Sequence, residues 1–407
     1  MPRSNIKQVR PQGFALLSYG FRPFFLLGSA YGVLMIGLWV PWFFGLIRLP
    51  SAFSPAVWHA HELLFGFFLA VMAGFLLTAV ASWTSRPAVR GALLGALAVL
   101  WLAGRIAVAV SRDIDEMVIA AVCLLFPIAL TIIMAREVGA AGNQRNFKTV
   151  ALVGSLAVAD AVFHYEAWLT GRARLSTALA ISLVLIVLIV IAGRIVPNVT
   201  PNWLKANRPG LLPRPFGTFD VAAAAISVAA LGAWVLSRWF LSKQLPQPGT
   251  TAFTGVLLLA AAAANLLRQW RWRPMRTFAE PLAAVLHVAY LFVAIGFALV
   301  GAALLAQNYD VEAAGLHAWT TGAFATMILA VMTRTTRGHT GNALSAPWST
   351  VAIYASIVAA ALARIASSLL PGMTLVLVPV SGVLWIAAFL GFLLLYGRML
   401  VMPRAQA

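Results

Sequence analysis

Six histidines are the residues of this chain whose type and placement could carry chemistry. The stretch WHAHE (58–62) places two of them beside a glutamate, just where a long apolar segment begins. Ionisable groups inside a membrane are costly, so they normally face a cavity or each other. Imidazoles without thiolates are typical ligands of haem iron, copper or zinc. The candidate metal ligands are His59, His61, His164, His287, His317 and His339.

Carboxylates and arginines accompany these histidines. Asp160 precedes His164 by four residues, which places both on one helical face, and a carboxylate that orients a histidine is common at metal sites. Arg105 and Arg364 lie within apolar segments and are candidates to hold haem propionates as charge-assisted pairs. The alternatives are that Arg105 pairs with Asp160, or that both arginines extend toward the surface. Glu62 and Asp160 are the candidate proton-carrying residues, with Glu280 as a further one.

The spacing within WHAHE limits what its side chains can share. Residues two apart on a regular helix point about 200° apart, so His59 and His61 cannot bind one ion from such a helix. Either the helix begins after them, or they serve different partners. Glu62 follows His59 by three residues and is expected on its side, and Gly66 extends that stripe.

Several classes of protein are excluded by motif or composition. HExxH and GxxxxGK[ST] are absent, which argues against a zinc protease and a nucleotide hydrolase. Cys123 is the single cysteine, so disulfides within one chain and Cys-rich metal sites are excluded, and we expect it to be a small filler residue. The net charge of +18 is explained by basic loops on one side of a membrane, and no nucleic-acid partner is expected.

The elements that must position these residues are membrane helices. The chain is 62% hydrophobic and 10% charged, against about 25% charged for soluble domains. Apolar runs long enough to cross a bilayer recur along its length. The prediction is an all-α polytopic membrane protein, a bundle of about 12 transmembrane helices. They are expected at about 20–46, 58–83, 91–110, 116–135, 148–169, 175–196, 219–237, 250–267, 279–305, 315–333, 348–369 and 373–397.

Charge and proline give the orientation and the organisation. Far more Lys and Arg residues fall in segments on the side of the N-terminus, so both termini are predicted to be cytoplasmic. We expect residues 1–407 to form a single integral-membrane domain, in which a Pro-rich cytoplasmic loop, 197–218, joins two six-helix halves (1–196 and 219–407). HELLFGFFLAVM (61–72) and HAWTTGAFATMI (317–328) each start with His and have Gly five residues later. Either an internal duplication or chance would explain the similarity of the two stretches.

Four stretches together carry a family resemblance: FRPFFLLG (21–28), WHAHELLFGFFLAVMAGFLLTAVASWT (58–84), LHVAYLF (286–292) and HAWTTGAFATMILAVMTRTTRGHTG (317–341). The chain resembles the NnrS family of bacterial membrane proteins. That resemblance implies haem (b-type) and copper cofactors, a cytoplasmic (inner) membrane location, and a role in nitric oxide metabolism, denitrification or resistance to nitrosative stress. The ligands it implies are His59, His61, His287, His317 and His339, with His164 in a weaker motif.

Topology divides the candidates between two levels of the membrane. His59, His61, His164 and His317 are predicted near the outer face, and His339 on the opposite side. We therefore expect an outer haem or haem–copper cluster and a second site near His287 and His339, with Arg334 and Arg337 on its propionates. The first hypothesis is a redox or nitric oxide-handling protein served by a membrane or periplasmic electron donor. The alternatives are a twelve-helix transporter and a haem or metal delivery protein.

Overall fold

The computed structural model describes residues 14–208, 210–242 and 248–403, and within these ranges the regular secondary structure is all helical. Twelve helices are long and apolar enough to cross a membrane, which confirms the predicted architecture. A membrane-spanning segment must satisfy its backbone polar groups internally, which a helix does. Ten of the spans are single helices: α1 (Phe21–Phe43), α4 (Ala92–Ala109), α5 (Glu116–Ala140), α6 (Phe147–Thr170), α7 (Arg174–Asn207), α8 (Thr218–Ser242), α9 (Pro248–Arg271), α10 (Pro281–Ala306), α13 (Trp348–Leu369) and α14 (Thr374–Val401).

The other two spans change helix type part of the way along. The second span consists of α2 (Pro55–His61), the π-helical η2 (Glu62–Phe68) and α3 (Leu69–Thr84). The tenth consists of α11 (Tyr309–His317), the π-helical η6 (Ala318–Ala325) and α12 (Thr326–Thr340). In each, the π-helix begins at the residue after a histidine. π-Helices are rare and frequently occur at functional sites, so η2 and η6 are candidate parts of a functional site.

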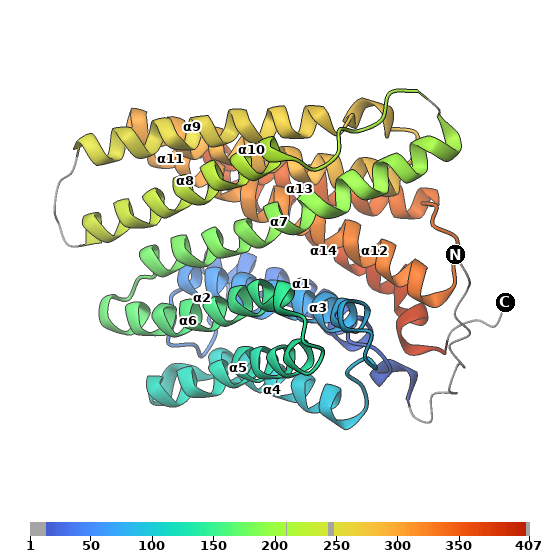
Figure 1. Ribbon diagram of the computed structural model, residues 1–407. Coiled ribbons are helices and arrows are strands. Elements are labelled where there is room, and N and C mark those ends of the chain that lie inside the picture. Colours follow the sequence, from blue (N-terminus) through green and yellow to red (C-terminus); the bar gives the residue numbers. More distant parts are fainter. Residues whose placement is uncertain (1–13, 209, 243–247, 404–407) are drawn as a thin grey trace.

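Two groups of helices lie on opposite sides of α7 (Figure 1). α8, α9 and α10 lie along one side, α4, α5 and α6 along the other, and α7 runs between them in contact with α6 and α8. α1 packs against α14 and α3, and α13 packs against α14 and α11. We call the end of the bundle at which α2 and α11 begin the histidine end.

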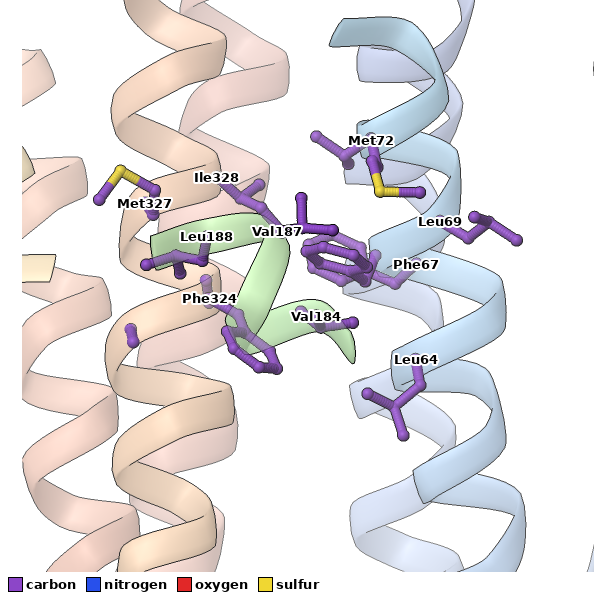
Figure 2. Packing of buried hydrophobic residues seen from close by; sticks show 14 of the residues in the cluster. Leu64, Phe67, Leu69, Met72, Val184, Val187, Leu188, Phe324, Met327 and Ile328 are labelled. Atoms are coloured by element: carbon purple, nitrogen blue, oxygen red, sulfur yellow. The ribbon is translucent and has the colours of Figure 1, made fainter. Parts of the chain in front are cut away.

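The two interrupted spans face each other across the core (Figure 2). Side chains of η2 and α3, such as Phe67, lie opposite those of η6 and α12, such as Ile328, and Val187 of α7 lies between them. The rings of Phe68 and Phe324 make contact, with their centroids 5.6 Å apart. These side chains are all at most 9% exposed, so the π-helical segments are fixed by packing on several sides.

The predicted loop 197–218 is wrong in its first half, because α7 continues to Asn207. Pro197 and Pro201 lie inside this helix, where each removes one backbone hydrogen bond. The Thr200 hydroxyl donates to the Val196 carbonyl at 2.8 Å, and its oxygen lies 3.1 Å from His287 Nε2 of α10. The contacts of Thr200 therefore stabilise α7 in the segment where the two prolines remove backbone hydrogen bonds.

The first and last spans meet at the opposite end of the bundle. Arg22, near the start of α1, donates to the carbonyl oxygens of Leu400 and Met402 at 2.8 and 2.6 Å, at the end of α14. A cation at a helix C-terminus satisfies carbonyls that lack an intrahelical partner. The basic segment at residues 1–13 and the terminus at 404–407 lie outside the described residues. The cytoplasmic placement of both termini stays a prediction.

Candidate functional site

His61 is the centre of a hydrogen-bonded cluster at the histidine end. Its Nδ1 lies 2.8 Å from Glu62 Oε1, and its Nε2 lies 3.1 Å from Asp160 Oδ1 and 3.2 Å from His164 Nε2. Asp160 and His164 come from α6, and their carboxylate and imidazole are 3.7 Å apart, as their spacing of four residues predicts. The His61 side chain is fully buried. Two histidines and two carboxylates therefore converge in the interior of the bundle.

Glu62 is neutralised by residues from two other spans. Arg105 Nη1 of α4 donates to Glu62 Oε1 at 2.6 Å, and the Tyr31 hydroxyl of α1 donates to Glu62 Oε2. Glu62 is fully buried and Arg105 is 5% exposed, so the charges meet away from solvent. Buried charges persist only when they are paired and hydrogen-bonded. Arg105 thus pairs with Glu62, and the alternative of an Arg105–Asp160 pair is wrong.

Gly66 makes room for this network. A Cβ atom at Gly66 would lie 2.9 Å from both Arg105 Nη1 and Glu62 Oε2 and 3.0 Å from Tyr31 Cε1. Any larger residue would force the ion pair or the tyrosine ring to move. The Gly66 carbonyl also accepts a bond of 2.9 Å from Trp101 Nε1 of α4, which fixes the backbone beside the ion pair.

The same cluster has the donor set of a metal site. His61, His164 and Cys123 each offer one ligand atom, and these three atoms lie within 4.8 Å of one another. Two nitrogens bound to one tetrahedral metal at about 2.05 Å are roughly 3.3 Å apart, close to the 3.2 Å between the Nε2 atoms. Glu62 on the Nδ1 of His61 is the second-layer carboxylate that orients many metal-bound histidines. The residues present therefore fit a buried metal ion.

Aromatic rings enclose this cluster. The rings of Phe53, Phe65 and Phe163 lie 5.2 to 5.5 Å from the His61 ring, centroid to centroid. Phe53 also contacts His164. An apolar shell of this kind excludes water and lowers the local dielectric, which tunes the properties of a bound metal.

A second group lies beside the first and shares the helix α2. His59 stacks on Trp39 of α1 with ring centroids 4.1 Å apart. His317 ends α11, and Arg364 lies on α13, which packs against α11. Thus His59 and His61 serve different partners, as their spacing requires. Glu62, expected on the side of His59, instead contacts His61. The π-helix begins at Glu62, so the regular helical spacing no longer fixes the direction of its side chain.

His317 is oriented by its own helix. Its Nδ1–H donates to the Ala313 carbonyl at 2.6 Å, in the last turn of α11. That bond assigns the proton to Nδ1 and leaves the lone pair on Nε2, which is the form in which a neutral histidine binds a metal. Arg364 of α13 donates to Ser367 Oγ at 2.7 Å.

His287 and His339 lie toward the other end of the bundle, away from the two groups. His287 Nε2 is 3.1 Å from Thr200 Oγ1, and its ring contacts Trp272. The His339 ring packs near Phe21 and Tyr19. The six histidines therefore lie at two levels of the described bundle, and which level faces outward stays a prediction.

A cavity of about 320 Å³ lies beside His339. Arg334, Thr335, Leu286 and Phe75 also line it. Arg337, predicted to work with Arg334, instead donates to the Ala343 carbonyl at 2.6 Å. Of the two arginines proposed for an inner cofactor, only Arg334 faces this cavity.

Two members of the first group were not found from the sequence. Tyr31 stands in an apolar segment with no motif around it, and Cys123 was expected to be a filler residue. Neither position shows in sequence that it meets His61 or Glu62, because both contacts join different spans. Residue type was the one available signal, since a phenol and a thiol are polar groups in a membrane helix.

Comparison with known protein families gave a match. The model of the family described as "NnrS protein" matches residues 15–404. No curated protein matched the chain. The match spans nearly the whole chain and includes every histidine and arginine of the two groups. The chain therefore belongs to the NnrS family.

Proposed function

We propose that this multi-pass protein binds haem and copper in the bacterial cytoplasmic membrane and acts in nitric oxide metabolism or resistance to nitrosative stress. Redox chemistry or nitric oxide binding takes place at the histidine end. The observation that carries the proposal is the 3.2 Å separation of His61 Nε2 and His164 Nε2, inside a buried cluster backed by two carboxylates. Family membership supports the same cofactors.

The chain's residues have separate tasks in this proposal. His61 and His164, with Cys123 or Asp160, would hold copper, and His317 offers its free Nε2 to haem iron. Bound in this way, the two metals would supply one-electron chemistry and an affinity for nitric oxide. Glu62 holds His61 in one orientation. Asp160, whose Oδ1 lies 3.1 Å from His61 Nε2, is placed to accept and pass on a proton beside the metal when it is not itself a ligand.

Access to such a site needs no polar path. Nitric oxide is small and uncharged and dissolves in lipid, so it can reach a histidine cluster enclosed by Phe53, Phe65 and Phe163. The same rings hinder the entry of water and of large solutes. A protein with this arrangement is suited to a small apolar reactant.

The test is a spectrum with metal analysis on one detergent-purified sample. We expect haem bands that sharpen on reduction with dithionite, a positive pyridine haemochrome assay, and stoichiometric iron and copper. His61→Ala and His164→Ala should each lower copper content, and His317→Ala should lower haem absorbance. Glu137→Gln is the control, because Glu137 lies outside both groups and pairs with the exposed Arg136.

One result would overturn the proposal. A colourless and metal-free protein, after growth with iron and copper supplied, would exclude the redox function. Substrate flux through such a metal-free protein in proteoliposomes would then establish the transport alternative.

A further inference from the structure

The two interrupted spans repeat one local construction. His61 and His317 each end an α-helix, a π-helix follows, and Gly66 and Gly322 each stand five residues after the histidine. Each glycine meets an aromatic ring of the preceding span. A Cβ at Gly66 would lie 3.0 Å from the Tyr31 ring, and a Cβ at Gly322 would lie 2.5 Å from that of Phe292.

An arginine of the following span completes each construction. Arg105 stands four residues before the end of α4 at Ala109, and Arg364 stands five residues before the end of α13 at Leu369. Arg105 lies beside Glu62 and His61, and Arg364 lies on α13, which packs against η6 and against α11, the helix that ends at His317. Tyr31, His61, Gly66 and Arg105 of the first site thus correspond to Phe292, His317, Gly322 and Arg364 of the second.

The two copies differ in one chemical respect. The residue after His61 is Glu62, whereas the residue after His317 is Ala318. The phenol that donates to Glu62 belongs to Tyr31, and its counterpart Phe292 has no hydroxyl. The carboxylate and its hydrogen-bond donor are therefore missing together from the second copy, while the arginine is kept.

Arg364 is consequently a cation that lacks the partner Arg105 has. Among the described residues, its one side-chain hydrogen-bond acceptor is Ser367 Oγ, and no carboxylate lies within ion-pair distance. At the same end of the bundle, His59 Nδ1 is buried without a hydrogen-bond partner in the described structure. A cation and an unsatisfied polar nitrogen inside a membrane are both costly, so each indicates a missing ligand atom.

We propose that Arg364 and His59 bind an anionic oxygen group, a carboxylate or a small oxyanion, in the place that Glu62 fills beside Arg105. The group can be a propionate of a cofactor or a free anion, and Arg–carboxylate bonds serve both. The proposal does not depend on the redox function, because it follows from the missing carboxylate alone.

The second group is also more accessible than the first. His59, His317 and Arg364 each keep partial exposure, whereas His61, Glu62 and Asp160 are almost fully buried. A cavity of about 440 Å³ at the histidine end is lined by Ala60, next to His59, and by Ala313 and Leu316, next to His317. Arg172, Arg174 and Arg238 lie on its wall, and Glu312, which also lines the cavity, pairs with Arg238. The charge of Arg172 and Arg174 is not balanced by this carboxylate, and positive charge around a cavity raises the local concentration of anions.

The experiment uses the detergent-purified full-length protein with formate as the probe anion. Thermal unfolding is followed by tryptophan fluorescence at constant ionic strength, because a ligand that binds the folded state raises the unfolding temperature with its concentration. The test variants are Arg364→Gln, and Ala318→Glu, which supplies the missing carboxylate. Arg48→Gln, an exposed arginine of the loop at the same end, is the matched control. Pigment content is recorded for each sample.

A free-anion site predicts that formate raises the unfolding temperature of the wild type and of Arg48→Gln, and that both test variants lose this response. A site for a cofactor propionate predicts no formate response in the wild type and a several-fold loss of bound pigment in Arg364→Gln. A wild type with no formate response and an Arg364→Gln variant with full pigment would overturn the proposal. Glu62→Ala is a second check, since it opens an equivalent site at Arg105 and should create a new formate response.

Discussion

Replacing Glu62 by glutamine tests whether the buried ion pair holds the first site together. The change removes the charge that neutralises Arg105, and it leaves His61, Tyr31 and Arg105 with a weaker shared acceptor. Breaking a buried pair by removing one partner costs about 3–5 kcal/mol, because the remaining charge stays desolvated. We expect a loss of that size in the free energy of unfolding, or about two to three and a half orders of magnitude in the unfolding equilibrium constant.

The assay is a double-mutant cycle measured by equilibrium unfolding of the purified protein in a denaturing detergent. Arg105→Gln should destabilise the protein to a similar extent, since it leaves Glu62 charged and buried. The double variant Glu62→Gln/Arg105→Gln carries two amides of similar size and should recover roughly 2 kcal/mol relative to the sum of the single changes. That recovery is the coupling between the two charges.

Glu137 supplies the control for this cycle. It pairs with Arg86 and Arg136, whose side chains are 41% and 60% exposed. Exposed pairs contribute about 0–1 kcal/mol, so Glu137→Gln should change little. If the losses from Glu62→Gln and Arg105→Gln simply add, or if Glu62→Gln costs no more than Glu137→Gln, the two charges are not coupled and the reasoning is refuted.

Two further predictions concern packing and charge elsewhere in the core. Gly322→Ala should destabilise the protein by about 1–3 kcal/mol, because the added Cβ would lie 2.5 Å from the Phe292 ring. Gly232→Ala is the control, because a Cβ at Gly232 would have no atom within 4 Å, and it should be neutral or stabilising by up to about 1 kcal/mol. If thermal unfolding shows the same loss of stability for both variants, the packing argument is contradicted. Asp220→Asn should lower the free energy of unfolding by about 3–5 kcal/mol, because Arg268, which is 2% exposed, loses its 2.9 Å ion pair. A decrease below about 1 kcal/mol in the detergent unfolding assay would show that the pair contributes little.

The parts of the fold predicted from sequence are those that depend on local pattern. Apolar runs located the twelve spans, because length and hydropathy are what a bilayer requires of a helix. The spacing of Asp160 and His164 correctly placed them on one face, since α6 is a regular helix there. The opposed directions of His59 and His61 followed from the same geometry.

The parts that were missed depend on departures from that pattern or on contacts between spans. The prediction that Glu62 lies on the side of His59 was wrong, because the spacing rule assumes an α-helix and the chain becomes π-helical at Glu62. Tyr31 and Cys123 reach the site from α1 and α5, and the residues around them in the sequence do not indicate these contacts. The course of α7 beyond Pro197 was lost because prolines usually end helices.

The difference between the two repeated sites bears on how they work together. The first contains its own counter-charge, Glu62 against Arg105, and is sealed by aromatic rings, so its charge balance is fixed by the chain itself. The second keeps the arginine and lacks the carboxylate, so its charge balance depends on a group from outside the described chain. α2 carries a histidine to each site, two residues apart, and any movement of this helix acts on both. Occupation of the second site by an anion would therefore fix His59 and, through the same turn of helix, the position of His61.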